Sequence, residues 1–400
     1  MDLIGWVIFL VALLFSVMLH ETGHFVVAKW FGMKATRYFV GFGPTIWSTW
    51  RGETEYGIKA LPIGGFVKIV GMHSLDDPDD PEDEPRSFRS HPAWQRIAVL
   101  SAGSFMHFVL AFLLIAGLAL SVGIENDNTT QLGTISTCVA SSVTALDNGT
   151  CTASNAASPA RLAGLQVGDT VTAFDGKPVS NWTQLGSDIR DAPVGSPATV
   201  TVRRHGKLLT LHTTLSSISG RSGAYLGIAP TTVFQIASPL GAIDYAGTSF
   251  GQVVVGSAKA VAALPAALPD LFNKKKRAST AGGQVSSVVG AAEATGYAVA
   301  ANVGWQYKVS FILLLIASLN IFVGVFNMLP LLPLDGGHIA VIVYERIRAF
   351  FARLRGRPDP GLANMAKLLP VSFSLFMIVV FFGVVLILAD IVNPVNIAGG

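Results

Sequence analysis

The chain of 400 residues is 51% hydrophobic and only 13% charged, whereas an average soluble domain carries roughly 25% charged residues. This composition excludes a disordered chain and fits an ordinary soluble protein poorly. The formal net charge of +3 is too small to indicate nucleic-acid binding, so we expect no nucleic-acid partner. The lipid bilayer is the expected environment of at least part of the chain.

Four apolar runs are long enough to cross a bilayer, which takes about 20 residues in a helix. The first begins at Leu3 and stays mostly apolar to Trp30. The other three contain no charged residue and cover 97–124, 309–334 and 368–389. We therefore predict an α-helical multi-pass membrane protein with about four spans.

Lysine and arginine gather in two of the loops that join these runs. Such residues are enriched in cytosolic loops of membrane proteins. They are Lys29, Lys34, Arg37, Arg86, Arg89 and Arg96 in the first loop, and Arg346, Arg348, Arg353, Arg355, Arg357 and Lys367 in the second. These loops are predicted to be cytosolic, which leaves both termini and the long segment 125–308 on the extracytoplasmic side.

The first run contains a metal-binding pattern, H-E-x-x-H, formed by His20, Glu21 and His24. Positions i and i+4 share one face of a helix, so both imidazoles can reach one zinc ion. Ionisable residues are costly in a membrane helix and indicate function. Seventeen residues from Leu3 to His20 span about 26 Å at 1.5 Å each. We therefore expect the metal towards the cytosolic side, with Glu21 placed to take a proton from water.

A catalytic zinc ion usually has three protein ligands, so a third must come from elsewhere in the chain. Asp335 is the preferred candidate because it follows two prolines that interrupt the third apolar run and free backbone groups. Irregular backbone at membrane depth is tolerated only around a buried or watery site. His338 is the alternative ligand. His107, in the second run, is more typical of a packed, hydrogen-bonded core histidine.

Together, H-E-x-x-H in the first helix and N-x-x-P-x-x-P-x-D-G at Asn327–Gly336 resemble the site-2 protease family of intramembrane zinc metalloproteases. The resemblance implies that His20, His24 and Asp335 bind Zn²⁺ and that Glu21 is the catalytic base.

It also implies that Asn327 helps to hold the substrate or the developing oxyanion. Asn320, about two helical turns earlier, is a weaker candidate for this role. The alternative is that Asn320 only joins two helices through a hydrogen bond. The chain departs from the family at its A-G-P-x-x-N motif, because Ser104 follows Gly103 and His107 stands near the position of the asparagine.

The segment Gly64, Gly65, Phe66, Val67 and Lys68 resembles the G-F-V-K segment of a membrane-associated β-hairpin loop in this family. Residues 38–71 read as short strands with glycine and proline turns. An exposed edge at 64–67 could pair with an unwound substrate through backbone hydrogen bonds. A plain surface hairpin is the alternative.

The segment 158–178 looks like the helix-turn and strand-turn signature of a PDZ domain, with a hairpin turn signal at Asp175–Gly176. Further strands are expected at 198–203 and 208–215 from their alternating pattern. We predict an inserted, extracytoplasmic, β-rich PDZ-like domain whose strand 132–139 forms the peptide-binding edge. A steric plug without a peptide ligand is the alternative.

Both cysteines of the chain, Cys138 and Cys151, fall in this external domain. An oxidising compartment would permit a disulfide between them; two free thiols are the alternative.

The predicted organisation has eight parts. They are 1–35, the first span with H-E-x-x-H; 36–75, the hairpin loop; 76–92, an acidic cytosolic linker; 93–124, the second span; 125–228, the PDZ-like domain; 229–306, an extracytoplasmic or amphipathic connector; 307–350, the third span with N-x-x-P-x-x-P-x-D-G; and 366–393, the fourth span.

The expected function is hydrolysis of peptide bonds in or near the transmembrane segment of single-span membrane proteins. The resemblance is to the bacterial, sigma-regulating, PDZ-bearing branch, and to actinobacterial members in the single PDZ-like domain and the compact length. It implies a bacterial cell-membrane location, anti-sigma factors as substrates, a stress-response role and an upstream site-1 protease that cuts first. The alternatives are a metal transporter or sensor, and a PDZ-based membrane receptor without proteolysis.

Overall fold

The computed structural model describes residues 3–72, 81–140, 151, 155–219, 222–267, 272, 287–363 and 365–392. The chain divides into two compact units. The membrane unit comprises 1–121 and 238–400, and the inserted unit comprises 122–237.

Four helices of the membrane unit are long and apolar enough to cross a bilayer: α1 (Leu3–Trp30), α2 (Ala93–Ser121), α9 (Trp305–Asn327) and α11 (Met365–Val392), the last over Pro370–Val392. Each of the four predicted apolar runs thus contains one of these helices. A helix is the form such runs take in lipid, because it satisfies every backbone polar group within one segment.

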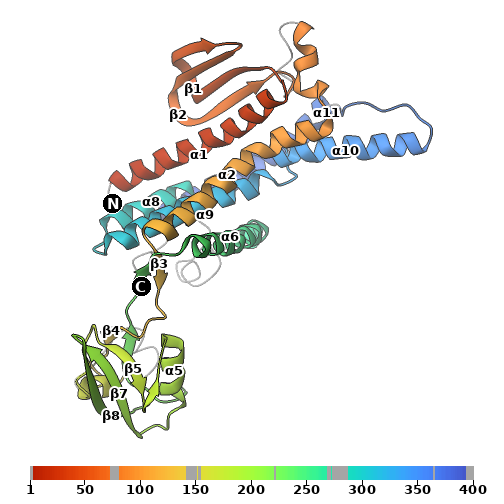
Figure 1. The fold of residues 1–400 in the computed structure, drawn as a ribbon. Helices are drawn as coiled ribbons and strands as arrows, with labels where there is room; N and C mark the ends of the chain where they lie inside the picture. The colour runs from red at the N-terminus through yellow and green to blue at the C-terminus, as the bar shows by residue number, and fades with distance from the viewer. Residues whose placement is uncertain are drawn as a thin grey trace. The chain divides into compact units, whose positions relative to one another are not determined.

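Helix α2 is central in the membrane unit, where it packs against α1, α9, α6 (Pro239–Ala267) and α10 (Asp335–Leu354) (Figure 1). Helices α1 and α2 approach closely at Gly23, where a Cβ atom would lie 2.5 Å from the carbonyl oxygen of Ala102. A buried ion pair of 3.0 Å between Arg96 and Glu345 joins α2 to α10. Helix α8 (Val288–Ala300) packs against α1, α9 and α11.

The range 307–350, predicted as one span, contains two helices. Helix α9 ends at Asn327, α10 begins at Asp335, and residues 328–334 between them include a cis Leu332–Pro333 bond. Proline lacks a backbone N–H and clashes with the preceding turn, so the two prolines end the helix before the aspartate. Asp335 therefore stands at the start of a new helix.

Strands β1 (Ala35–Arg51) and β2 (Thr54–Ile69) form an antiparallel pair in which each strand contributes two segments. Residues 35–40 pair on one side with 65–69. On their other side, residues 37–40 pair with 55–58, and 45–51 pair in turn with 54–59. Residues 65–69 are therefore an edge of this small sheet, and β2 packs against α1 (Figure 1).

Polar contacts anchor the sheet to α1. Glu53, in the turn between β1 and β2, forms ion pairs with Lys29 at the end of α1 and with Arg86, the latter at 2.7 Å. Tyr38 lies within hydrogen-bond distance of Thr22 Oγ1, at 2.8 Å.

Arg86 belongs to the predicted acidic linker 76–92. Residues 76–80 of that linker lie outside the described residues, and the rest begins with two short 3₁₀ helices, η1 (Pro81–Arg86) and η2 (Phe88–Ser90). Phe88 is buried, so this part of the segment is packed.

The inserted unit contains a four-stranded sheet in the order β6-β5-β7-β8 (Lys177–Pro178, Thr170–Phe174, Pro197–Arg204, Lys207–Thr214). Helices α4 (Pro159–Leu162) and α5 (Trp182–Asp191) complete a core of its own. Asp175 and Gly176 both have positive φ in the β5–β6 turn, as an aspartate–glycine hairpin requires.

The predicted strand 132–139 is shorter than expected, because β4 covers only Leu132–Ile135, where it pairs with β9 (Ile228–Pro230). Cys138 and Cys151 are joined in a disulfide. Strand β3 (Ile124–Asn126), near the start of the unit, pairs with β10 (Val233–Gln235), near its end.

Candidate active site

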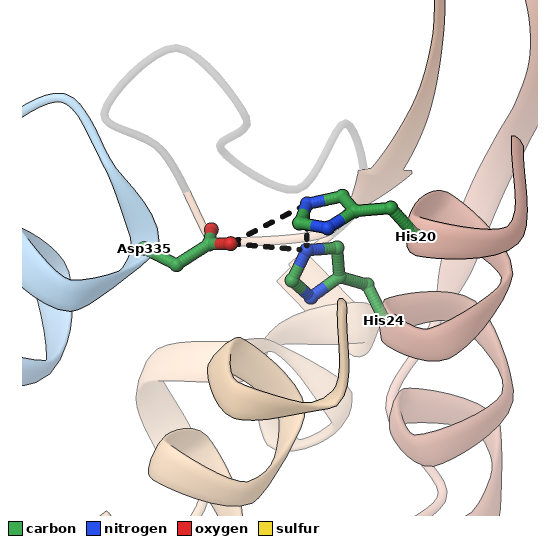
Figure 2. A group of neighbouring side chains, drawn as sticks. All are labelled: His20, His24 and Asp335. Carbon is green, nitrogen blue, oxygen red and sulfur yellow. Dashed lines mark hydrogen bonds and ion pairs between the residues drawn. The ribbon is translucent and has the colours of Figure 1, made fainter. Parts of the chain in front are cut away.

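Two histidines of α1 and one aspartate of α10 converge in the membrane unit (Figure 2). Oδ2 of Asp335 lies 3.4 Å from Nε2 of His20 and 3.5 Å from Nε2 of His24, and the two Nε2 atoms are 3.0 Å apart. Among the histidine, cysteine, aspartate and glutamate side chains of the described residues, these three lie close enough together to hold one metal ion. His338, the alternative third ligand, does not belong to it.

The aspartate reaches the histidines because the chain folds tightly just before it. A Cβ atom at Gly336 would lie 2.3 Å from the carbonyl oxygen of Met328, and one at Gly337 would lie 2.5 Å from the carbonyl carbon of Leu331. Only glycine tolerates such contacts. The glycine pair after Asp335 thus lets residues 328–334 pack against the first turn of α10.

The three side chains fit a zinc ion by donor chemistry and by burial. Two imidazole nitrogens and one carboxylate oxygen form a usual zinc donor set, and ligand atoms about 2.0–2.1 Å from a tetrahedral ion are about 3.4 Å apart. His24 is only 3% exposed, and Oδ2 of Asp335 is buried with no hydrogen-bond partner in the described residues. A buried carboxylate oxygen without a partner is costly, and a cation between these atoms removes the cost.

His24 is held by a second contact that orients its ring. Its Nδ1 lies 2.8 Å from the carbonyl oxygen of Val99 on α2. Because a carbonyl only accepts, Nδ1 carries the proton and donates it, and Nε2 directs its lone pair towards His20 and Asp335. Such outer contacts are typical of metal-binding histidines.

Glu21 lies beside the histidines and contacts the edge of the sheet. The backbone N–H of Val67 donates a hydrogen bond of 3.0 Å to Oε2 of Glu21. Of the predicted segment 64–67, the structure thus brings Val67 directly to the predicted base. Gly65 lies against α1, because a Cβ there would be 2.5 Å from Sδ of Met18.

Gly103 contributes to the site in a way that the sequence reasoning missed. A Cβ atom at this position of α2 would lie 2.5 Å from Nε2 of His24 and 2.5 Å from Cε1 of His20. The backbone of α2 therefore forms the wall against which both imidazoles pack. The only signal in the sequence was the partial match to the A-G-P-x-x-N motif.

His107 and Asn320 form a buried pair next to this wall. Nδ1 of His107 lies 2.7 Å from Oδ1 of Asn320, whose Nδ2 donates to the carbonyl oxygen of Ile316. The His107 and His20 rings are 5.1 Å apart between centroids. These contacts support the bridging role of Asn320 between α2 and α9, and they agree with a packed, hydrogen-bonded His107.

Asn327 is the last residue of α9 and is partly exposed, just before the turn that leads to Asp335. Its side chain makes no hydrogen bond within the part of the chain that the structure describes.

Comparisons with known proteins identify a family that this chain resembles over most of its length. A family model described as Peptidase family M50 matches residues 8–357. The zinc metalloprotease Rip1 of Mycolicibacterium smegmatis is 36% identical over 417 residues, covering 98% of both chains. Rip1 of Mycobacterium tuberculosis is 37% identical over 416 residues, again covering 98% of both chains.

A putative zinc metalloprotease of Fusobacterium nucleatum is 30% identical over 332 residues, which are 83% of this chain and 85% of that protein. Among solved structures, the PDZ domain of an SdrC-like protein from Listeria monocytogenes is 21% identical. That match covers 25% of this chain and 90% of the domain, with a TM-score of 0.17.

Proposed function

This chain belongs to peptidase family M50 and is an intramembrane zinc metalloprotease, and we propose that its catalytic centre is formed by His20, His24, Asp335 and Glu21. The observation that carries this assignment is the convergence of the two histidines and the aspartate from α1 and α10. No other described residues bring a comparable ligand set together.

His20 and His24 would hold the zinc ion through Nε2, and Asp335 through its carboxylate. A bound zinc ion would act as a Lewis acid. It would polarise a carbonyl oxygen and lower the pKa of a water molecule to about 7. The contact between His24 and Val99 keeps the ring in the tautomer that this role needs.

Glu21 acts as the general base and then as the general acid. The N–H of Val67 holds Oε2, which leaves Oε1 to take a proton from the attacking water and to pass it to the leaving amine. A carboxylate with one oxygen fixed is preorganised for this transfer. Asn327 donates its free amide N–H to the oxygen of the scissile carbonyl, where negative charge develops.

Cleavage by the purified protein tests this assignment. Glu21→Gln keeps the size of the side chain but cannot take the proton, so we expect at least a hundredfold loss of cleavage of a single-span substrate. Glu125→Gln, the same change at an exposed residue of strand β3 in the inserted unit, is the matched control and should cleave normally. Full cleavage by Glu21→Gln, or in the presence of a zinc chelator, contradicts the assignment.

Zinc content separates the ligands from the base. Asp335→Ala should lose most of its bound zinc by elemental analysis, whereas Glu21→Gln should retain it. The control is Asp127→Ala, an exposed aspartate of the inserted unit. Equal zinc in Asp335→Ala and the wild type would remove Asp335 from the ligand set.

The sheet edge at Gly64, Gly65, Phe66 and Val67 is the proposed contact for an unwound substrate. Its support is that 65–69 is an edge segment and that Val67 touches Glu21. An extended substrate added to this edge would run past the catalytic carboxylate, gripped by backbone hydrogen bonds that tolerate many sequences.

Two substitutions of Val67 test whether its backbone N–H orients Glu21. Val67→Pro removes the backbone N–H, whereas Val67→Ala keeps it and removes only side-chain atoms. We expect Val67→Pro to lower kcat about tenfold or more relative to Val67→Ala, since a hydrogen bond to a charged group contributes about 1.5–3 kcal/mol. Equal rates in the two folded variants would show that this N–H is not used.

The substrates that we propose are single-span membrane proteins such as anti-sigma factors, trimmed first by a site-1 protease. Support comes from the family, whose members act within membranes, and from the match to Rip1 over nearly the whole chain. In a strain that lacks this protein, a trimmed anti-sigma fragment should accumulate in the membrane. Unchanged processing in that strain would contradict the substrate class.

The inserted unit is proposed to be an extracytoplasmic PDZ-like domain that screens substrates, with both termini on the same side. The positive loops and the disulfide support this orientation. A cysteine placed at Asp127 should react with a membrane-impermeant maleimide in intact cells, and one at Arg357 should react only after lysis. The reverse labelling pattern would invert the topology.

A further inference from the structure

A groove runs along the exposed side of α10, and the proposed reaction does not use it. One part has a volume of ≈ 500 Å³ and the other ≈ 370 Å³. Tyr344 and Ile347 line both parts, so the two are continuous. The groove lies wholly within the membrane unit.

The larger part carries positive charge. Arg348, Arg355 and Arg357 line it, and no acidic side chain of the described residues does. Arg348 is held in place because its Nη2 donates a hydrogen bond of 2.6 Å to the carbonyl oxygen of Gly361. Its Nε is buried and has no hydrogen-bond partner among the described residues.

The nearby acids are engaged elsewhere. Glu345 pairs with Arg96, and Asp359 accepts the N–H of Gly361 and lies 3.9 Å from Arg353. The positive charge at this end of the groove is therefore left for an external anion.

The smaller part is apolar. None of the described residues that line it has a charged side chain. This part extends past Ile339 and Val343 to Met328, Pro330 and Gly336. From Ile347 to Gly336 the helix rises about 17 Å at 1.5 Å per residue. One leaflet of hydrocarbon is about 15 Å thick, so the apolar part matches the length of one acyl chain.

We propose that this groove binds an anionic phospholipid. Its phosphate lies against Arg348, Arg355 and Arg357, because guanidinium groups bind phosphate oxygens through paired hydrogen bonds. An acyl chain follows the apolar part of the groove. Basic pockets beside membrane helices recognise lipid headgroups in this way.

Occupancy of the groove affects the catalytic centre through contact. Gly336, at the far end of the apolar part, directly follows Asp335 in the chain. A bound acyl chain packs against the turn that carries this carboxylate. An acidic peptide would satisfy the arginines but would leave the uncharged part of the groove empty, and for this reason the observations favour a lipid.

The test measures lipid binding to the full-length protein in detergent by native mass spectrometry, without any proteolysis readout. The titrants are dioleoylphosphatidylglycerol, dioleoylphosphatidylcholine, inorganic phosphate and a glutamate-rich peptide. We expect phosphatidylglycerol to bind at least tenfold more tightly than each of the other three. Equal binding of phosphatidylcholine, or stronger binding of phosphate or the peptide, overturns the proposal.

Two double variants localise the site. Arg355→Gln with Arg357→Gln should weaken phosphatidylglycerol binding at least tenfold. Arg51→Gln with Arg346→Gln removes the same charge from exposed positions that do not line the groove and leaves the pair of Asp359 and Arg353 intact, so this variant should bind as the wild type does. Equal losses in both variants would indicate nonspecific attraction and overturn the proposal.

Ile347→Asn tests the acyl-chain part. This exposed residue lines both parts of the groove, so the substitution should weaken phosphatidylglycerol binding severalfold while all arginines remain. Unchanged binding by this variant would contradict the placement of the acyl chain.

Discussion

Gly103 determines how closely α2 can approach the two histidines of α1. A side chain at this position would overlap His20 and His24, since even a Cβ atom would come within 2.5 Å of both rings. The proposed zinc site thus depends on the absence of a Cβ atom at Gly103 as well as on the ligands themselves.

We predict that Gly103→Ala lowers zinc affinity about tenfold or more, because a displaced outer contact typically costs 10–100-fold in metal binding. The control is Gly117→Ala on the same helix, where a Cβ would meet nothing within 4 Å. Competition with a fluorescent chelator measures both affinities. Wild-type affinity in Gly103→Ala would show that the helices separate without disturbing the site.

Asn320 and His107 are expected to stabilise the contact between α2 and α9. Asn320→Leu leaves Nδ1–H of His107 buried without an acceptor, which costs about 1–3 kcal/mol of unfolding free energy. Replacing both residues with Leu removes the donor as well, so we expect the double variant to recover much of that loss. Denaturant unfolding in detergent, arranged as a double-mutant cycle, measures this coupling. Strictly additive losses would contradict it.

At the scale of elements, the sheet formed by β1 and β2 is held by ion pairs at Glu53 and by a backbone hydrogen bond at Val67. Arg86 and, to a lesser degree, Lys29 hold the pKa of Glu53 down to about 2 from its usual 4.5, against the opposing effect of partial burial. The backbone N–H of Val67, on the edge segment of the same sheet, donates a hydrogen bond to Glu21.

The lowered pKa of Glu53 predicts an acid-sensitive anchor. A carboxylate whose pKa falls on folding stabilises the fold above its unfolded pKa, and that stability is lost as the pH falls through the folded pKa. The wild type should therefore have a higher Tm than Glu53→Gln above pH 4.5. The difference should shrink between pH 4.5 and about 2. A difference in Tm that does not depend on pH would exclude this anchor.

Elements with strong local patterns were predictable, whereas their ends and pairings were not. The apolar run 309–334 predicted a membrane helix, but the helix stops at Asn327. The end depends on how residues 328–334 fold against Gly336 and Gly337, which hydropathy does not describe. Strand β4 likewise ends at Ile135, because its partner β9 covers only Ile228–Pro230.

At the scale of the whole molecule, the inserted unit has the features of an independent domain. Its buried residues form a core of their own that includes Leu132, Phe174 and Leu226. Its first and last strands, β3 and β10, pair with each other, so the chain enters and leaves the unit side by side.

We predict that residues 122–237 fold alone when expressed in an oxidising compartment. Circular dichroism should show a single cooperative thermal transition. Reduction of the disulfide between Cys138 and Cys151 should lower its midpoint, because the crosslink restricts the unfolded chain. A gradual, noncooperative melt of the oxidised fragment would indicate that the unit needs the rest of the chain.

The sequence by itself determined the membrane class, the four helices apolar enough to span a bilayer, and the common face of α1 that carries His20 and His24. Charged side chains are costly in lipid, so the uncharged runs of the sequence indicate the spans. A spacing of four residues places two histidines on one face of a helix. Only the tertiary structure showed that Asp335 lies with His20 and His24, that Val67 contacts Glu21, and that Gly103 packs against the histidines. These contacts join residues that lie tens to hundreds of positions apart, and local periodicity carries no information about such distances.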